Sequence, residues 1–237
     1  MKYLLLVFAG LTGVFAGCEQ QTNTSVVYSG ALMSIMGGDL KATTSLKDLE
    51  DIQNLYALGA AEDLKGEIQI FDGKPVNSFV KNHKLEIDTS FDRRAALLVS
   101  TQVSEWEKIQ IPEDLDTKEA FEKFVATVAK KRGFGEQPFP FRIKGGVKSL
   151  DWHVIDWDGS DKVHTHQKHQ ESGVKGTLEN DQVEIIGFYS ENHQGVFTHH
   201  SNFIHMHFKT ENATIAGHVD DLKLNGKAIL LLPKSYK

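Results

Sequence analysis

Alternation of apolar and polar side chains in residues 203–208 predicts a β-strand. The segment is Phe-Ile-His-Met-His-Phe, and successive side chains of a strand point to opposite faces. His205 and His207 therefore share one face, and the apolar side chains next to them in the chain share the other. Polar residues 209–212 follow and predict a turn, and Thr214 with Ile215 indicates a second strand.

An antiparallel hairpin with its tip near Glu211 and Asn212 brings a third histidine to the same face. In that register His218 lies opposite His205, so three imidazoles converge on one side of the hairpin. Three neutral imidazoles with room for a fourth ligand are a common way to hold catalytic Zn²⁺. A histidine-rich strand that faces solvent is the alternative interpretation.

Apolar residues recur at helical spacing in two other segments. One starts at Ser45, an N-cap candidate, and ends at Gly59; the other starts at Asp116 and ends at Gly133. Strands separated by two helices favour an α+β fold. Apolar runs bounded by turn residues predict these strands at residues 66–73, 95–101 and 183–189.

The composition is that of a soluble globular protein. Hydrophobic residues make up 40% of the 237 residues, which is enough for the core of one large domain or two small ones. The net charge of −6 argues against a nucleic-acid-binding surface, because such surfaces are basic. We therefore expect no nucleic-acid partner.

The first 17 residues have the pattern of a secretory signal peptide. Lys2 precedes the apolar run 3–11, and small residues come before Cys18. This arrangement resembles the lipobox of bacterial lipoproteins, in which the cysteine becomes the lipidated first residue. We expect a signal peptide at 1–17, a flexible tether at 18–27, and export to the bacterial cell envelope with a lipid anchor as the membrane contact. A plain signal peptide with an incidental cysteine is the alternative.

Two further features could carry chemistry. Arg142 lies inside an apolar segment, where an unpaired guanidinium is costly, so it either forms a structural ion pair or binds an anion. The polar residues 156–173 predict a solvated loop whose histidines have no apolar frame. His199 and His200 precede the hairpin and could form the rim of its site. The histidines of the loop are His164, His166 and His169.

Several of these segments together resemble the α-acetolactate decarboxylase family. That family has a His-x-His strand followed by Gly-His-Val, which matches residues 204–208 and 216–219. A Gly-Glu element that leads to Asp-Gly matches residues 66–73, and an apolar Arg-Ile-x-Gly segment matches residues 141–145. The resemblance covers residues 28–222, which is nearly all of the expected mature chain.

The resemblance implies a homodimer of chains with two β-sheet-based subdomains. The N-terminal α/β subdomain would occupy residues 28–135. The C-terminal β-rich subdomain, at 136–237, would bind Zn²⁺ or another divalent ion on its antiparallel hairpin. The implied site residues are the metal ligands His205, His207 and His218 and the catalytic residues Glu67 and Arg142.

The implied reaction is decarboxylation of 2-acetolactate, or of a closely related 2-hydroxy-3-oxo acid, to acetoin and CO₂. The enzyme would be a zinc-dependent carboxy-lyase of acetoin biosynthesis, in which the metal acts as a Lewis acid. Residues 232–237 contain no acid, where the family pattern has a further glutamate. A surface-tethered metal- or ligand-binding lipoprotein without turnover is therefore the alternative, and a zinc-dependent hydrolase is a third interpretation.

Overall fold

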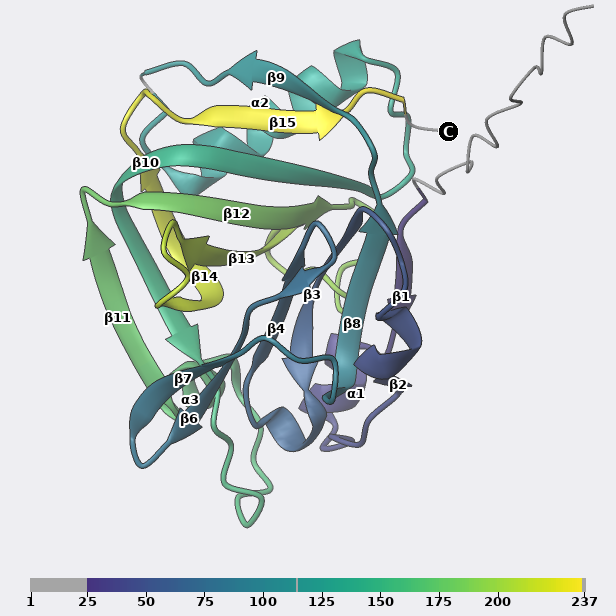
Figure 1. Cartoon of the computed structure of the whole chain (residues 1–237), viewed down its shortest axis with the longest axis vertical. Helices are drawn as coiled ribbons and strands as arrows, with labels where there is room; N and C mark the ends of the chain where they lie inside the picture. The colour runs from purple at the N-terminus through teal and green to yellow at the C-terminus, as the bar shows by residue number, and fades with distance from the viewer. Residues whose placement is uncertain (1–24, 114, 236–237) are drawn as a thin grey trace, which may run out of the picture.

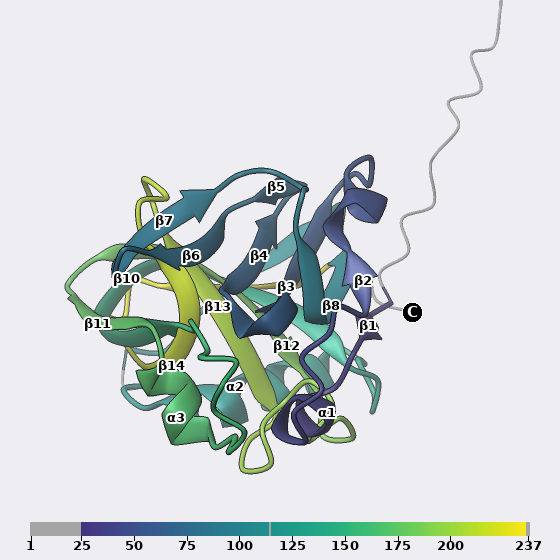
Figure 2. The same cartoon turned by 90° about the horizontal axis from the view of Figure 1, so that it is seen from below.

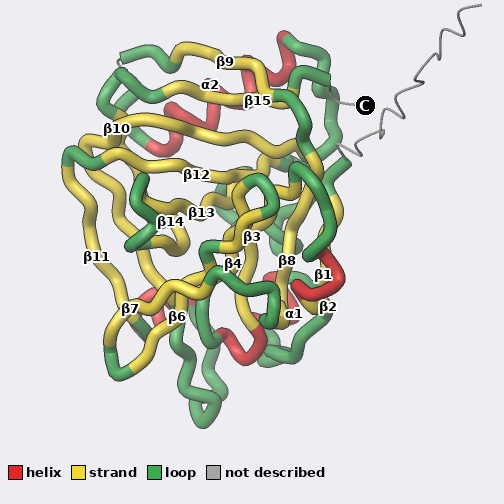
Figure 3. The backbone as a smooth tube through the Cα atoms, viewed as in Figure 1, coloured by secondary structure: helices red, strands yellow, loops and turns green. Residues whose placement is uncertain are grey.

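Two antiparallel β-sheets form the body of the protein in the computed structural model, which describes residues 25–113 and 115–235 (Figure 1). Helices are few, as the coloured tube in Figure 3 shows. The expected β-sheet-based architecture with few helices is therefore confirmed. No helix within the described ranges is both long and apolar enough to span a bilayer. The expected signal peptide, Cys18 and most of the expected tether lie outside the described residues.

The first sheet is built from the N-terminal part of the chain. Its strands are β1 (Val27–Ser29), β2 (Thr44–Ser45), β3 (Leu55–Ala61), β4 (Glu67–Phe71), β5 (Lys74–Pro75), β6 (Asn77–Lys81), β7 (Lys84–Asp88) and β8 (Arg94–Gln102). They pair antiparallel in the order β1-β8-β3-β4-β6-β7, with β2 on β8 and β5 on β4. Strand β4 ends at the predicted turn, where Asp72 and Gly73 both have the positive φ that a two-residue hairpin requires. The strands predicted at 66–73 and 95–101 are confirmed.

The helix predicted from Ser45 to Gly59 is wrong beyond its first turn. Ser45 does cap a helical turn, because its side chain accepts a hydrogen bond from the Lys47 N–H, but this 3-10 turn, η1 (Leu46–Leu49), is short. Strand β3 follows, and its residues from Leu55 to Leu58 are all buried. Burial on both faces is the pattern of a central strand. Gly59 is needed for close strand approach, since a Cβ there would lie 2.0 Å from the Leu97 carbonyl oxygen of β8.

The second sheet partly closes on itself. Its strands are β9 (Trp106–Gln110), β10 (Phe139–Val154), β11 (Val174–Glu179), β12 (Gln182–Tyr189), β13 (Ile204–Thr210), β14 (Ala216–Leu224) and β15 (Ile229–Pro233). The long strand β10 pairs with β12 through its first half and with β14 through its second half. Since β12, β13 and β14 also pair in sequence, these four strands form a closed ring. The strand predicted at 183–189 is β12.

Helix α2 (Lys118–Lys131) confirms the second predicted helix, with Thr117 rather than Asp116 as its N-cap. Its buried side chains Phe121 and Val125 belong to the core of the second sheet. Strand β9 also joins that sheet, because its antiparallel partner is β15 from the C-terminal end of the chain. The two sheets therefore divide the chain after β8, and the subdomain boundary expected at residue 135 stays a prediction. The other helices are α1 (Leu32–Met36), α3 (His166–Glu171) and the 3-10 turn η2 (Glu62–Leu64).

The two sheets pack against each other across a shared interior. Strand β4 contacts β14, and β3 contacts β12 (Figure 2). Tyr56 and Leu58 of the first sheet pack with Ile186 and Phe188 of the second. Polar side chains of β4 and β13 continue the same interface beyond this apolar contact. The candidate site lies in this polar part.

Candidate metal centre

The predicted hairpin forms from β13 and β14, with a register that differs from the expected one by two residues. His207, and not His205, lies opposite His218. The Asn212 side chain accepts hydrogen bonds from the backbone N–H and the hydroxyl of Thr214. The turn therefore extends to Thr214, nearer to the second strand than expected. Because the displacement is an even number of residues, His218 stays on the face that carries the other two histidines.

The three imidazoles gather in the interior of the protein. The ring centroids are 5.0 Å apart for His205 and His207, 5.1 Å for His205 and His218, and 5.4 Å for His207 and His218. All three residues are buried, and one nitrogen from each lies within 4.8 Å of the others. The Nε2 atoms of His205 and His207 are 3.3 Å apart. Two nitrogens bound tetrahedrally to one Zn²⁺ at 2.0–2.1 Å would be separated by about this distance.

Hydrogen bonds outside the cluster fix which nitrogen carries hydrogen in two of the three rings, those of His207 and His218. The Gln69 amide nitrogen donates to Ser78 Oγ at 3.1 Å, so its oxygen accepts from His207 Nδ1 at 3.0 Å. His218 Nδ1 donates to Asp220 Oδ1 at 3.2 Å. The Nε2 atoms of His207 and His218 are therefore left as lone-pair donors. This outer arrangement is typical of metal-ligating histidines.

Burial keeps the cluster neutral. Burial and the neighbouring imidazoles hold the pKa values of His205 and His207 well below the ordinary value of 6.5. Burial likewise lowers the pKa of His218 to about 4. Burial alone would raise the pKa of Asp220, but its hydrogen bonds with His153 and His218 hold that pKa well below its ordinary range. Three neutral imidazoles beside an ionised carboxylate suit a divalent cation.

Glu67 joins the three histidines from the opposite sheet. It is the first residue of β4 and is 4% exposed. Its Oε2 lies 3.8 Å from His207 Nε2, and its Oε1 lies 3.8 Å from His153 Nε2 and accepts the Ile155 N–H at 3.3 Å. Burial raises the pKa of Glu67 to about 7, although the charge of His153 opposes this rise. The carboxylate expected from the sequence is therefore next to the cluster.

His153 is a buried residue of this site that the sequence analysis did not identify. It lies on β10 directly opposite His218, which itself lies opposite His207. Its Nδ1 is 2.8 and 3.0 Å from the two carboxylate oxygens of Asp220. Burial opposes its protonation, but the bond with Asp220 and the charge of Glu67 raise the pKa of His153. The alternation of Trp152, His153 and Val154 was the available indication of a strand here.

Arg142 forms a structural ion pair, which was one of its two expected roles. Its guanidinium binds the Glu184 carboxylate and donates to the Tyr56 hydroxyl at 3.0 Å. It also stacks over the rings of Tyr56 and Trp106, at 4.7 and 5.0 Å from their centroids. Burial opposes ionisation of Glu184, but Arg142 lowers its pKa. The recorded polar contacts of this guanidinium, within the part of the chain described, do not include the three histidines.

The additional histidines surround the centre without joining the three-histidine set. The His199 ring lies 6.2 Å from that of His205 and 4.5 Å from that of His166, as expected for a rim. His164 Nδ1 and His169 Nε2 are 3.0 Å apart. Both rings pack on Trp157, which is buried. The loop 156–173 therefore has an apolar frame, contrary to the sequence analysis, because Trp157 folds back under it.

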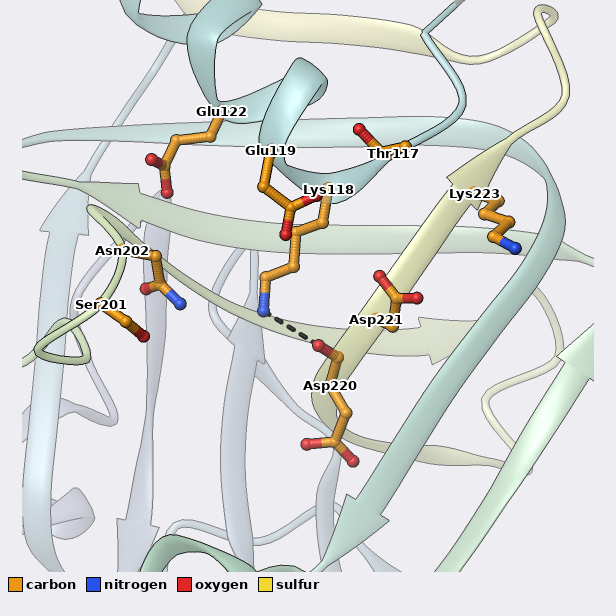
Figure 4. A pocket seen from close by; sticks show the side chains of 9 residues that line it. All are labelled: Thr117, Lys118, Glu119, Glu122, Ser201, Asn202, Asp220, Asp221 and Lys223. Carbon is orange, nitrogen blue, oxygen red and sulfur yellow. Dashed lines mark hydrogen bonds between the residues drawn. The ribbon is translucent and has the colours of Figure 1, made fainter.

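A cavity of about 490 Å³ lies beside Asp220, at the start of α2 (Figure 4). Lys118 and Asn202 line it together with polar residues of β14. Lys118 Nζ donates to the backbone oxygen of Asp220 at 3.0 Å. The backbone of Asp220 thus lies at the cavity, and its carboxylate contacts the histidines. Asp220 therefore connects the cavity with the candidate metal centre.

This fold and site define a two-sheet β protein with a buried three-histidine candidate metal centre. The family model of alpha-acetolactate decarboxylase matches residues 27–232, so the chain belongs to this family. The family expected from the sequence motifs is thereby confirmed. No curated protein sequence matches the chain.

Solved structures of the same family have the same fold. Acetolactate decarboxylase from Bacillus subtilis subspecies spizizenii is 17% identical, with a TM-score of 0.71 over 89% of this chain and 87% of that one. The alpha-acetolactate decarboxylase of Bacillus subtilis strain 168 is 18% identical, with a TM-score of 0.68 over 88% of this chain and 84% of that one. A Staphylococcus aureus protein of unknown function, similar to alpha-acetolactate decarboxylase, is 17% identical, with a TM-score of 0.68 over 90% and 86%.

Proposed function

We propose that this protein is a metal-dependent decarboxylase that converts 2-acetolactate, or a closely related 2-hydroxy-3-oxo acid, to acetoin and CO₂. Membership of the family supports a carboxy-lyase. The observation that carries the metal dependence is the set of three buried, neutral imidazoles at His205, His207 and His218, with nitrogens within 4.8 Å of one another. Zn²⁺ and other divalent ions that accept imidazole fit this set.

The residues of the chain divide the work of the reaction. A divalent ion held by the three histidines would supply Lewis acidity to the oxygens of the substrate. Glu67 lies beside them with a pKa of about 7, so it can accept the hydroxyl proton and return a proton at neutral pH. Loss of CO₂ leaves the electron pair of the broken C–C bond to the neighbouring carbonyl, and one proton then forms the new C–H bond. Burial of all four side chains excludes bulk water from this exchange.

The test combines metal analysis with a turnover assay on the same preparation. We expect about one zinc ion per chain and acetoin formation from racemic 2-acetolactate. His207→Ala should remove both, because His207 is a central member of the cluster. His200→Ala is the matched control, since this imidazole is exposed. Turnover by a metal-free preparation would contradict the proposal, and metal binding without turnover of any 2-hydroxy-3-oxo acid would favour the non-catalytic alternative.

We also propose that the chain is exported and lipidated at Cys18. The support is the pattern of the first 18 residues. Mass spectrometry of the mature protein should find a diacylated or triacylated N-terminal cysteine, and Cys18→Ser should move the protein from the membrane fraction to the soluble fraction. A mature chain that begins elsewhere and carries no lipid would overturn this part of the proposal without affecting the enzymatic part.

A further inference from the structure

His153 is held as firmly as the three candidate ligands, although it lies outside their set. Its side chain is 6% exposed. Both oxygens of Asp220 lie within hydrogen-bond distance of its Nδ1, at 2.8 and 3.0 Å. Its other nitrogen, Nε2, lies 3.8 Å from Oε1 of Glu67. The His153 ring therefore has a defined orientation, which Asp220 sets at Nδ1, and a defined partner, the Glu67 carboxylate next to Nε2.

A β-bulge places Asp220 where it can hold two imidazoles. In the pairing of β14 with β10, Asp221 faces Asp151 and Val219 faces Trp152, so Asp220 is the extra residue between them. Bulges re-aim side chains in this way. The carboxylate therefore turns back toward His153 and His218, which oppose each other on the two strands.

Other contacts keep the Asp220 carboxylate in place. Gln170 Nε2 donates to its Oδ1 at 2.8 Å, and Lys118 binds its backbone oxygen at 3.0 Å. Together with His153 and His218, these donors approach the residue from four structural elements, α2, α3, β10 and β14, and fix it. The position of the His153 ring is thus set by the fold and not by a free side-chain torsion.

The hydrogen-bond pattern at Glu67 shows what His153 does. Nδ1 of His153 donates to Asp220, so Nε2 is the nitrogen that faces Oε1 of Glu67. A lone pair on Nε2 would repel the lone pairs of Oε1, and a hydrogen or a cation is therefore needed between these two atoms. The separation of 3.8 Å is an ion-pair distance that a small movement would close to a hydrogen bond. The Ile155 N–H holds the same oxygen. Oε2 is then left facing the Nε2 of His207.

We propose that His153 is a positioning residue, oriented by Asp220, that holds one oxygen of Glu67 so that the other faces the three-histidine centre. The inference rests on the metal centre of the proposed function. His153 acts through Glu67 and not as a further ligand of the same ion. Within the described residues, the groups able to share an ion are His205 with His207 and His218, and separately His153 with His218 and Asp220, not all four histidines together.

A double-mutant cycle of zinc affinity tests this role. Zinc dissociation constants are measured by competition with a chelator for the wild-type chain, His153→Ala, Glu67→Gln and the double variant. We expect His153→Ala to weaken zinc binding by about 10-fold, as loss of an outer-shell partner does. The double variant should bind zinc nearly as Glu67→Gln does if His153 acts on the centre through Glu67, whereas an effect of His153 through Asp220 and His218 would persist in the Glu67→Gln background. The absorption spectrum of the cobalt-loaded protein should change in the same way for both single variants.

Two further variants separate positioning from general damage. Asp220→Asn should weaken zinc binding more than His153→Ala, since Asp220 orients both His153 and His218. His153→Gln retains an amide that can reach Glu67 and should recover part of the lost affinity; it replaces His153→Ala if that chain does not fold. Two results would overturn the inference while leaving the metal centre intact. One is a double variant whose loss of zinc affinity is the product of the losses in His153→Ala and Glu67→Gln. The other is an unchanged dissociation constant in His153→Ala and His153→Gln. A wild-type chain that binds no zinc would overturn both.

Discussion

Replacing Arg142 by methionine distinguishes a structural guanidinium from a substrate-binding one. The Arg142 and Glu184 side chains are 8% and 15% exposed, so their ion pair is buried. The guanidinium also contacts the faces of Tyr56 and Trp106. Methionine has a similar length and can fill the same space between these rings. The substitution therefore removes the charge and its hydrogen bonds and creates little cavity.

The expected cost follows from the charge that remains on Glu184. Breaking a buried pair by removing one partner costs about 3–5 kcal/mol. Lys144 and Lys209 lie 3.3 Å from the Glu184 oxygens and will compensate in part, so we expect a loss of about 3 kcal/mol, at the lower end of that range. For a chain of this size such a loss lowers Tm by roughly 6–12 °C. Adding Glu184→Gln should restore most of the loss, because the unpaired charge is then gone.

The assay is thermal and urea unfolding of the metal-free single and double variants, together with their zinc affinity. Ile186 separates Arg142 from His207 in the sheet, so zinc affinity should not change. Arg142→Met with a wild-type Tm and no turnover would refute this reasoning and return Arg142 to the anion-binding role. Failure of Glu184→Gln to restore stability would show that the charge of Glu184 is not the source of the cost.

Three further predictions concern the metal centre. Zinc at 100 times its dissociation constant should stabilise the fold by about 2.7 kcal/mol, so calorimetry with and without a chelator should show a clear shift in Tm; equal values would count against a native site. Gln69→Met removes the acceptor for His207 Nδ1 and should weaken zinc binding about 10–100-fold, measured by chelator competition; an unchanged affinity would contradict the assigned ring orientation. The folded pKa of His218, about 4, is below its unfolded value, so the unfolded chain binds more protons in acid. In the metal-free Glu67→Gln chain, which lacks the opposite effect of the raised Glu67 pKa, stability should therefore fall by about 3 kcal/mol from His218 as the pH falls from 6.5 to 4, and urea midpoints that do not fall over this range would refute it.

The face of the histidine hairpin could be predicted from the sequence, but its register could not. Side chains on a strand alternate with a period of two, so any register displaced by an even number keeps His218 on the face of His205 and His207. The register itself depends on the turn, and there Asn212 bonds with Thr214. Alternation is thus a reliable guide to which residues share a face, and a weak guide to which residues are opposite.

Local periodicity was misleading where tertiary burial decided the structure. Leu46, Leu49, Ile52 and Leu55 have helical spacing, and Ser45 does cap the first turn. The chain leaves the helix after Leu49 because the following apolar residues lie between two strands and are covered on both faces. Spacing within one segment does not contain this information, since the strands that cover β3 come from elsewhere in the chain.

Arg142 and His153, the buried basic residues of β10, show why the complete site required the structure. Counting alternate residues from Arg142 would place His153 on the opposite face of the strand. The pairing of β10 with β14 shifts between Val147 and Ser149, so one extra residue exchanges the faces. Gly145, where a Cβ would lie 2.8 Å from the Ala228 Cα, lies near the point at which β10 changes partners. The side chains of Arg142 and His153 therefore both face the interior between the sheets. Only His153, which lies beyond the bulge, is opposite His218 and next to Glu67. No pattern within residues 139–154 distinguishes the two positions.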